Sequence, residues 1–169
     1  MARTSLTDVL SVGDPAQAWN FDLFLPIIPG SASSRDLTFK CMTTDVPGTQ
    51  LEELAAPLHG VQIMYAGRRT YTHSMNVTFM ETHDWSTTEK FHRWVEIARS
   101  WRNNSGGLSS AYWTTAQLVL YNDVPQVVRT IQINNLFPTN VSEVQLDGSS
   151  SQLVQLSVEF RYTDHFPLN

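Results

Sequence analysis

The stretch Leu153-Val-Gln-Leu-Ser-Val-Glu-Phe-Arg-Tyr-Thr-Asp-His165 carries the clearest structural signal in the chain. Apolar and polar side chains alternate along most of it. A period of two predicts a β-strand with one face on a hydrophobic core and the other in an aqueous environment. The apolar members are Val154, Leu156, Val158, Phe160 and Tyr162, and the polar members are Gln155, Ser157, Glu159 and Arg161.

A second stretch of the same kind runs from Thr70 to Glu81. It predicts another amphipathic strand, whose polar face is uncharged. Periodicity leaves open whether these polar faces meet bulk solvent, a ligand or an enclosed aqueous space. The polar residues of interest in this strand are Thr72, Ser74, Asn76 and Thr78.

The rest of the chain predicts a mostly β domain. Further alternating stretches occupy 19–25, 37–44, 61–65, 116–123 and 126–135. One helix is expected over 86–102, opened by a capping box of Ser86 and Glu89. We therefore expect an all-β fold with one α-helix, an antiparallel β-sandwich or partly closed barrel.

Two segments lack sustained periodicity. Residues 1–18 are small and polar and predict an extended N-terminal arm, which leaves 19–169 as a single domain. Residues 45–67 include two prolines and two glycines up to Gly60 and predict a long loop. Long loops inside compact domains tend to be functional.

Composition narrows the function. The chain has 169 residues, a net charge of -5 and only 16% charged residues. A negative chain with few clustered cations argues against wrapping nucleic acid. So low a charge content favours a surface partly covered by other subunits. No apolar stretch is long enough to span a bilayer, so we expect no membrane partner.

Catalytic signatures are missing from the sequence. The five histidines do not form H-x-x-x-H or H-x-H spacings, and one cysteine allows no C-x-x-C pair. Neither G-x-S-x-G nor a nucleotide-binding glycine motif occurs. We expect no catalytic residue, no metal site and no cofactor, and a structural or binding role in place of an enzyme.

The order of features resembles a known family. The stretches that carry the resemblance are DPAQAWNFDLFLP (14–26), FKCMTTDVPG (39–48), AGRRTYTHSMNVTF (66–79), FHRW (91–94) and the C-terminal part from NNLFPTNVSEVQL (134–146) to the final alternating strand. In this order they resemble the tail tube proteins of contractile-tailed bacteriophages. The inner tubes of type VI secretion systems and of tailocins are related to that family.

The resemblance implies a fold and a function. Tail tube subunits form six-membered rings whose inner strands join into one β-barrel, and the rings stack into a hollow tube that conducts DNA into the host. The implied partners are other copies of the chain, the sheath, tape-measure and tail terminator proteins and the baseplate, in a virion assembled in the host cytoplasm. DNA would pass without sequence-specific binding.

Two other readings stay open. One is a secreted inner tube subunit of the type VI or tailocin kind. The other is a β-sandwich carbohydrate-binding module, with Trp85, Tyr112 or Trp113 as the platform on which a sugar stacks.

Residues can be assigned to these implied surfaces by their own chemistry. Contact between rings is expected from the long loop and the residues that follow it, with the N-terminal arm as a second candidate: Val46, Leu51, Glu52, Glu53, Leu54, Leu58, Met64, Arg68 and Arg69. The lumen candidates are the polar strand faces: Thr72, Ser74, Asn76, Thr78, Gln155, Ser157, Glu159 and Arg161. Ordinary outer exposure remains open for each. Arg93 and Glu96, on the polar side of the helix, are the sheath-facing candidates.

Overall fold

The computed structural model describes residues 15–31, 33–149 and 151–168. Most of the expected N-terminal arm, residues 1–14, lies outside the described part of the chain. No helix in the described residues is long and apolar enough to cross a membrane.

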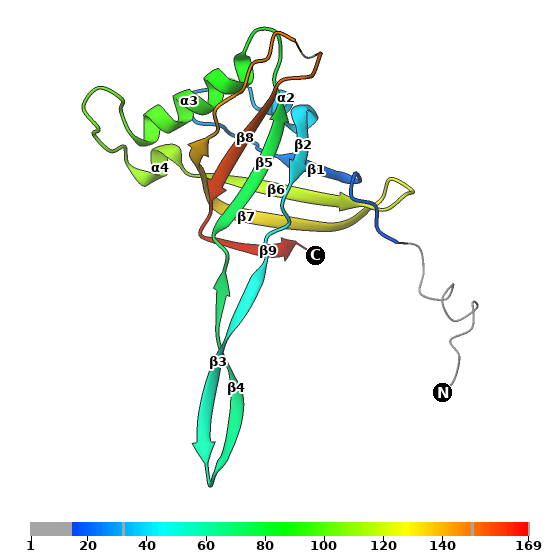
Figure 1. Ribbon diagram of the computed structural model, residues 1–169, viewed down its shortest axis with the longest axis vertical. Helices are drawn as coiled ribbons and strands as arrows, with labels where there is room; N and C mark the ends of the chain where they lie inside the picture. The colour runs from blue at the N-terminus through cyan, green and yellow to red at the C-terminus, as the bar shows by residue number, and fades with distance from the viewer. Residues whose placement is uncertain (1–14, 32, 150, 169) are drawn as a thin grey trace.

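One antiparallel sheet of seven strands forms the body (Figure 1). Strand β7 (Val127–Val141) belongs to both halves of this sheet. The first half holds β1 (Phe21–Phe24), β6 (Thr114–Tyr121), the start of β7 and β9 (Asp164–Leu168). The second half holds the end of β7, β8 (Gln155–Arg161), β5 (Ser74–Met80) and β2 (Cys41–Thr44). The predicted antiparallel β architecture is confirmed.

A bend within β7 lets the two halves pack against each other. Asn135 has φ 54°, a left-handed conformation that asparagine tolerates better than most residues. Before the bend β7 pairs with β6 and β9, and after it β7 pairs with β8. The strand expected to end at residue 135 therefore continues to Val141, because the bend turns the chain without ending its pairing.

The core lies between the two halves and is built by the alternating stretches. In β5 and β8 the apolar faces meet as cross-strand pairs, and all six side chains have zero exposure. Fully burying a large apolar side chain contributes about 1.5–3 kcal/mol, so these pairs anchor the second half of the sheet. The pairs are Met75 with Phe160, Val77 with Val158, and Phe79 with Leu156.

Helix α3 (Ser86–Ala98) packs on this apolar side of the sheet. The ring of Phe91 lies 5.0 Å from that of Phe79 and 5.8 Å from that of Phe160, measured between centroids. Trp94 Nε1 donates a hydrogen bond of 2.6 Å to the carbonyl of Tyr112 in the short helix α4 (Ser109–Tyr112). The helix therefore covers the face of β5 and β8 that is opposite to their polar side chains.

The ends of α3 differ from the expected ones. The helix stops at Ala98, and Trp101 is 65% exposed in the turn that follows. Its start is not closed by a capping box: the carboxylate of Glu81 accepts the N–H groups of Thr87 at 3.1 Å and Thr88 at 2.8 Å. Glu81 lies just after β5. Its carboxylate therefore caps the helix in place of the predicted pair of Ser86 and Glu89.

The strand expected over 37–44 is only partly a strand. Residues Arg35–Lys40 form a short helix, α2, and β2 begins at Cys41. The pair Asp36–Lys40, 3.3 Å apart at i,i+4 spacing, suits a helix. Leu37 is buried and Phe39 is 75% exposed, which a shared strand face would not allow.

The long loop expected over 45–67 is wrong for most of its length. Strands β3 (Thr49–Leu58) and β4 (Val61–Tyr71) form a hairpin that projects away from the body (Figure 1). Its turn is His59–Gly60, both with positive φ, as a two-residue hairpin turn requires. No part of the described chain covers this hairpin as a core, so its sequence lacks the simple polar and apolar alternation of β5 and β8.

Candidate functional site: a polar sheet face and an exposed hairpin

Seven of the eight lumen candidates share one face of the sheet. Strands β5 and β8 are antiparallel neighbours, and directly paired residues point to the same side. The hydroxyl oxygens of Thr78 and Ser157 lie 3.3 Å apart across the two strands. The pairs are Ser74 with Arg161, Asn76 with Glu159, Thr78 with Ser157, and Met80 with Gln155.

Thr72 lies apart from this face. The strand expected over 70–81 is interrupted at Thr72–His73, where His73 has φ 54°. The hydroxyl of Thr72 is 2.8 Å from that of Tyr162, the residue that follows β8 in the body. The alternation of residues across this break conceals the change from β4 to β5.

The charges on the polar face are paired locally. Arg161 and Glu159 form an ion pair of 3.0 Å, and Asp45 accepts the backbone N–H of Asn76 at 3.0 Å. The face therefore presents mainly hydroxyl and amide groups, with no uncompensated cation among the lumen candidates. Because Arg161 is paired with Glu159, the described residues of this face include no free cation that could bind a phosphate.

Neighbouring strands extend the polar face. Asn140 of β7 pairs with Glu159, and Thr43 of β2 pairs with Thr78. The sequence analysis missed both residues, since Asn140 lay beyond the strand expected over 126–135 and Thr43 lay near the end of the strand expected over 37–44. The only sequence signal for these two positions was a polar Thr or Asn next to apolar residues typical of a β-strand.

Both borders of this half-sheet are edge strands within the described chain. β2 pairs with β5 on one side, and residues 137–141 of β7 pair with β8 on one side. Edge strands present backbone N–H and C=O groups that can pair with another chain. The half-sheet can therefore be extended at either border by a second copy.

The hairpin has one continuous apolar face. Exposed apolar side chains that pair across β3 and β4 include Leu54 at 57% and Tyr65 at 53%. A two-stranded ribbon is at best marginally stable alone in water, and an exposed apolar surface indicates a partner. This apolar face consists of Leu54, Ala56, Leu58, Val61, Ile63 and Tyr65, paired in register.

The structure distributes the inter-ring candidates over several places. Leu54 and Leu58 belong to the apolar face. Glu53 and Met64 lie on the opposite face, since their positions alternate with those of the apolar face. Val46 and Leu51 are 56% and 60% exposed near the base, Glu52 lies in the bulge after Leu51, and Arg68 and Arg69 belong to the base of β4. The sequence analysis missed Val61, Ile63 and Tyr65, although their spacing of two was visible.

The sheath-facing candidates lie on the exposed side of α3. Arg93 and Glu96 line a groove of about 360 Å³ that Trp85 and Trp101 also border. Arg93 forms an ion pair with Glu89 of 2.5 Å. This groove and the polar sheet face are on opposite sides of the sheet, because α3 packs on the apolar side.

Three other features bear on possible chemistry or sugar binding: the Cys41 thiol, the possible metal ligands and the Tyr112–Trp113 pair. Burial raises the pKa of the Cys41 thiol to about 12, and nearby Asp22 adds to this shift. The described residues contain no cluster of three His, Cys, Asp or Glu side chains that could hold a metal ion. The rings of Tyr112 and Trp113 are nearly perpendicular at 75°, so they do not form a flat stacking platform.

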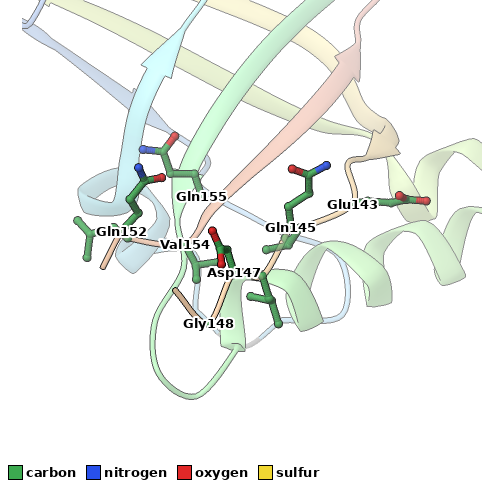
Figure 2. Close-up of a pocket in the computed structure, with 10 residues that line it drawn as sticks. Glu143, Gln145, Asp147, Gly148, Gln152, Val154 and Gln155 are labelled. Carbon is green, nitrogen blue, oxygen red and sulfur yellow. The ribbon is translucent and has the colours of Figure 1, made fainter. Parts of the chain in front are cut away.

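The loop that precedes β8 lies at the end of the body away from the hairpin (Figure 1), and Figure 2 shows a pocket beside it. It measures about 930 Å³ and is bordered by residues that precede β8. Figure 2 shows Gln145 and Gln152 on either side of Asp147. Hydrogen bonds from the side chain and backbone of Ser149 lower the pKa of Asp147.

Comparison with known proteins gives consistent matches. A family model described as phage tail tube protein matches residues 17–167. The tail tube protein gp19 of Enterobacteria phage T4 is 32% identical over 123 residues, which cover 72% of this chain and 75% of that protein.

Two solved structures share the fold. A chain in the PVC extracellular contractile injection system, solved as a sheath-tube complex in the extended state, has a TM-score of 0.62 and 13% identity, covering 98% of this chain and 99% of that one. A chain in the six-fold symmetrised baseplate of the anti-feeding prophage has a TM-score of 0.61 and 19% identity, covering 92% and 97%.

Proposed function

This chain belongs to the phage tail tube protein family and is a structural subunit of a phage tail tube, and we propose that it builds the tube as stacked six-membered rings. The observation that carries this proposal is the half-sheet of four strands, β7, β8, β5 and β2. It has a polar face, an apolar face covered by α3, and an edge strand at each border.

Ring closure follows from the edges. If β2 of one copy pairs with the end of β7 in the next, the half-sheets continue from copy to copy until the ring closes. A closed barrel has no free edges, and cyclic symmetry uses the same interface at every step. The six-fold symmetry named for the similar anti-feeding prophage structure supports six copies in a ring.

The polar face lines the lumen in this proposal. Helix α3 packs on the other side of the sheet, so the ring places the helices outside when the polar face is inside. Hydroxyl and amide groups with the internal Glu159–Arg161 pair would let DNA slide past, because no array of free cations is available to hold its phosphates.

The hairpin joins one ring to the next. Its apolar face is exposed in a single copy and would be buried against the neighbouring ring, which supports the inter-ring role expected for its residues. The N-terminal arm is a second candidate for contact between subunits. These contacts would let the rings stack into a continuous tube wall without any further component in it.

The outer side of α3 would face the sheath, with Arg93 and Glu96 in the exposed groove. The sheath-tube complex in which a similar fold was solved supports this choice. Tape-measure, terminator and baseplate proteins complete the proposed partners, in a virion tail assembled in the host cytoplasm. The role requires no catalysis, metal or cofactor.

Thiol labelling tests the orientation of the sheet. In a Cys41→Ser background, Ser157→Cys places a thiol on the polar face and Arg93→Cys places the matched thiol outside. In assembled tubes capped at both ends, we expect a bulky maleimide to modify position 93 and not 157, whereas free subunits react at both. Rapid labelling of position 157 in intact capped tubes would refute the proposed lumen.

A further inference from the structure

A separate pocket lies at the base of the hairpin, where β3 and β4 leave the body. It measures about 320 Å³. Strands β4, β7 and β9 supply most of its lining, and β3 supplies Thr49. Its lining consists of Thr49, Arg69, Tyr71, Arg129, Asp164, His165, Phe166 and Pro167.

The pocket has an excess of positive charge. Arg69 and Arg129 are exposed, and neither forms an ion pair with a described residue. The carboxylate of Asp164 accepts a hydrogen bond of 2.7 Å from Asn134 Nδ2. Two guanidinium groups and one carboxylate thus line the pocket, which gives it a positive charge although the chain as a whole is negative.

His165 adds an unsatisfied group to this pocket. Its Nε2 lies 3.3 Å from the hydroxyl of Thr49, while its buried Nδ1 has no hydrogen-bond partner in the described chain. Burial and the nearby Arg129 and Arg69 lower the pKa of His165, and Asp164 opposes them. Buried polar atoms in folded proteins nearly always have a partner, so this ring nitrogen marks an incomplete hydrogen-bonding site at the edge of the pocket.

The opposite end of the subunit supplies such acceptors. The loops 81–86, 142–149 and 151–154 lie at the end of the body away from the hairpin (Figure 1). They contain no Lys or Arg, and Asp84, Glu143 and Asp147 are exposed acids within them. Hydrogen bonds from Thr82 and Ser86 lower the pKa of Asp84 to about 2, so it is charged at neutral pH.

We propose that the pocket formed by Arg69, Arg129 and His165 binds a carboxylate side chain from these loops of a second copy in the next ring. This inference rests on the stacked rings proposed above, because head-to-tail stacking brings the hairpin end of one subunit against the loop end of the next. The ligand is a carboxylate presented by protein.

The pocket would set the rotation of one ring on another. An apolar hairpin face supplies contact area but tolerates sliding, since the hydrophobic effect is non-directional. Arginine–carboxylate pairs have a preferred, often bidentate geometry. The hairpin would therefore supply most of the contact area between rings, and the pocket would add an attractive contact that also fixes their angle.

Charge reversal tests the pocket in the full-length protein. Arg129→Glu changes one exposed lining residue, and Arg102→Glu, in the exposed turn after α3, makes the same change in charge elsewhere. We expect Arg129→Glu to raise the critical concentration for tube assembly at least tenfold and Arg102→Glu to leave it unchanged. Circular dichroism and the melting temperature of the free subunit report folding, and Arg129→Gln with Arg69→Gln serves if the reversal unfolds it.

A compensating reversal identifies the partner. Adding Asp84→Arg, Glu143→Arg and Asp147→Arg to Arg129→Glu should restore assembly, whereas adding Glu52→Arg in the hairpin should not. Rescue by Glu52→Arg alone, or no rescue by the loop substitutions, would overturn the assignment to the loops. A defect seen only when tubes contain DNA would show that phosphate is the ligand and would overturn it as well.

The outcome is separable from the proposed function. If the wild-type chain forms no rings or tubes, the ring proposal fails. If the wild type forms tubes and Arg129→Glu forms them equally well, the ring proposal survives and the carboxylate pocket fails.

Discussion

Replacing Leu54 by alanine should weaken tube assembly without destabilising the free subunit. Leu54 lies on the apolar face of the hairpin and is 57% exposed when the subunit is alone. Truncation to alanine removes three carbons, worth about 2.4 kcal/mol if fully transferred from water, and the exposed share of this is about 1.4 kcal/mol. Each subunit carries one hairpin, so the critical concentration should rise about tenfold.

Pelleting of tubes over a range of subunit concentrations measures this shift, and differential scanning calorimetry of the free subunit measures stability. Met64→Ala is the matched control, because Met64 is 54% exposed on the other face of the same hairpin. The reasoning is refuted if Leu54→Ala lowers the melting temperature and leaves assembly unchanged. Equal losses from both variants would contradict the assignment of one docking face.

Three further predictions concern the body. Phe160→Ala, at a site with zero exposure beneath α3, should cost about 3–5 kcal/mol in the free energy of unfolding by urea titration; a loss below 1 kcal/mol would contradict the described core. Although burial alone would raise it, hydrogen bonds from Thr88 and from the N–H groups of Thr82, Thr88 and Thr87 lower the pKa of Glu81. This stabilisation is present above the unfolded pKa near 4.3 and is lost as the pH falls through the folded value, so the stability gap between the wild type and Glu81→Gln should shrink from pH 6 to pH 3. Thr78→Lys with Ser157→Lys should make tubes retain DNA at low salt and release it at high salt, and tubes that ignore DNA at every salt concentration would argue against a lumen lined by these residues.

The sequence predicted the parts of the fold in which one chain supplies its own core. Phe160 and Val77 alternate with polar neighbours because each strand has one side on that core. The polar partners, such as Ser157 and Thr78, could be assigned to a common face for the same reason. Their register could not be read, since pairing depends on strands far apart in the chain.

The remaining errors have separate physical causes. The hairpin has no core within its own chain and carries apolar residues such as Met64 on its other face, so only residues 61–65 alternated visibly within 45–67. Helix α2 is six residues long, too short for helical periodicity to be distinguished from a strand. The pocket at Arg69, Arg129 and His165 joins residues from three strands, and only their tertiary arrangement brings them together.

The most direct test of the account is a cryo-EM reconstruction of tubes assembled from the purified full-length chain. The account predicts six subunits in each ring, β5 and β8 with Ser157 and Thr78 facing the lumen, α3 on the outside, and every hairpin against the neighbouring ring. A reconstruction with α3 lining the lumen, or a chain that remains a monomer at every concentration, would contradict it.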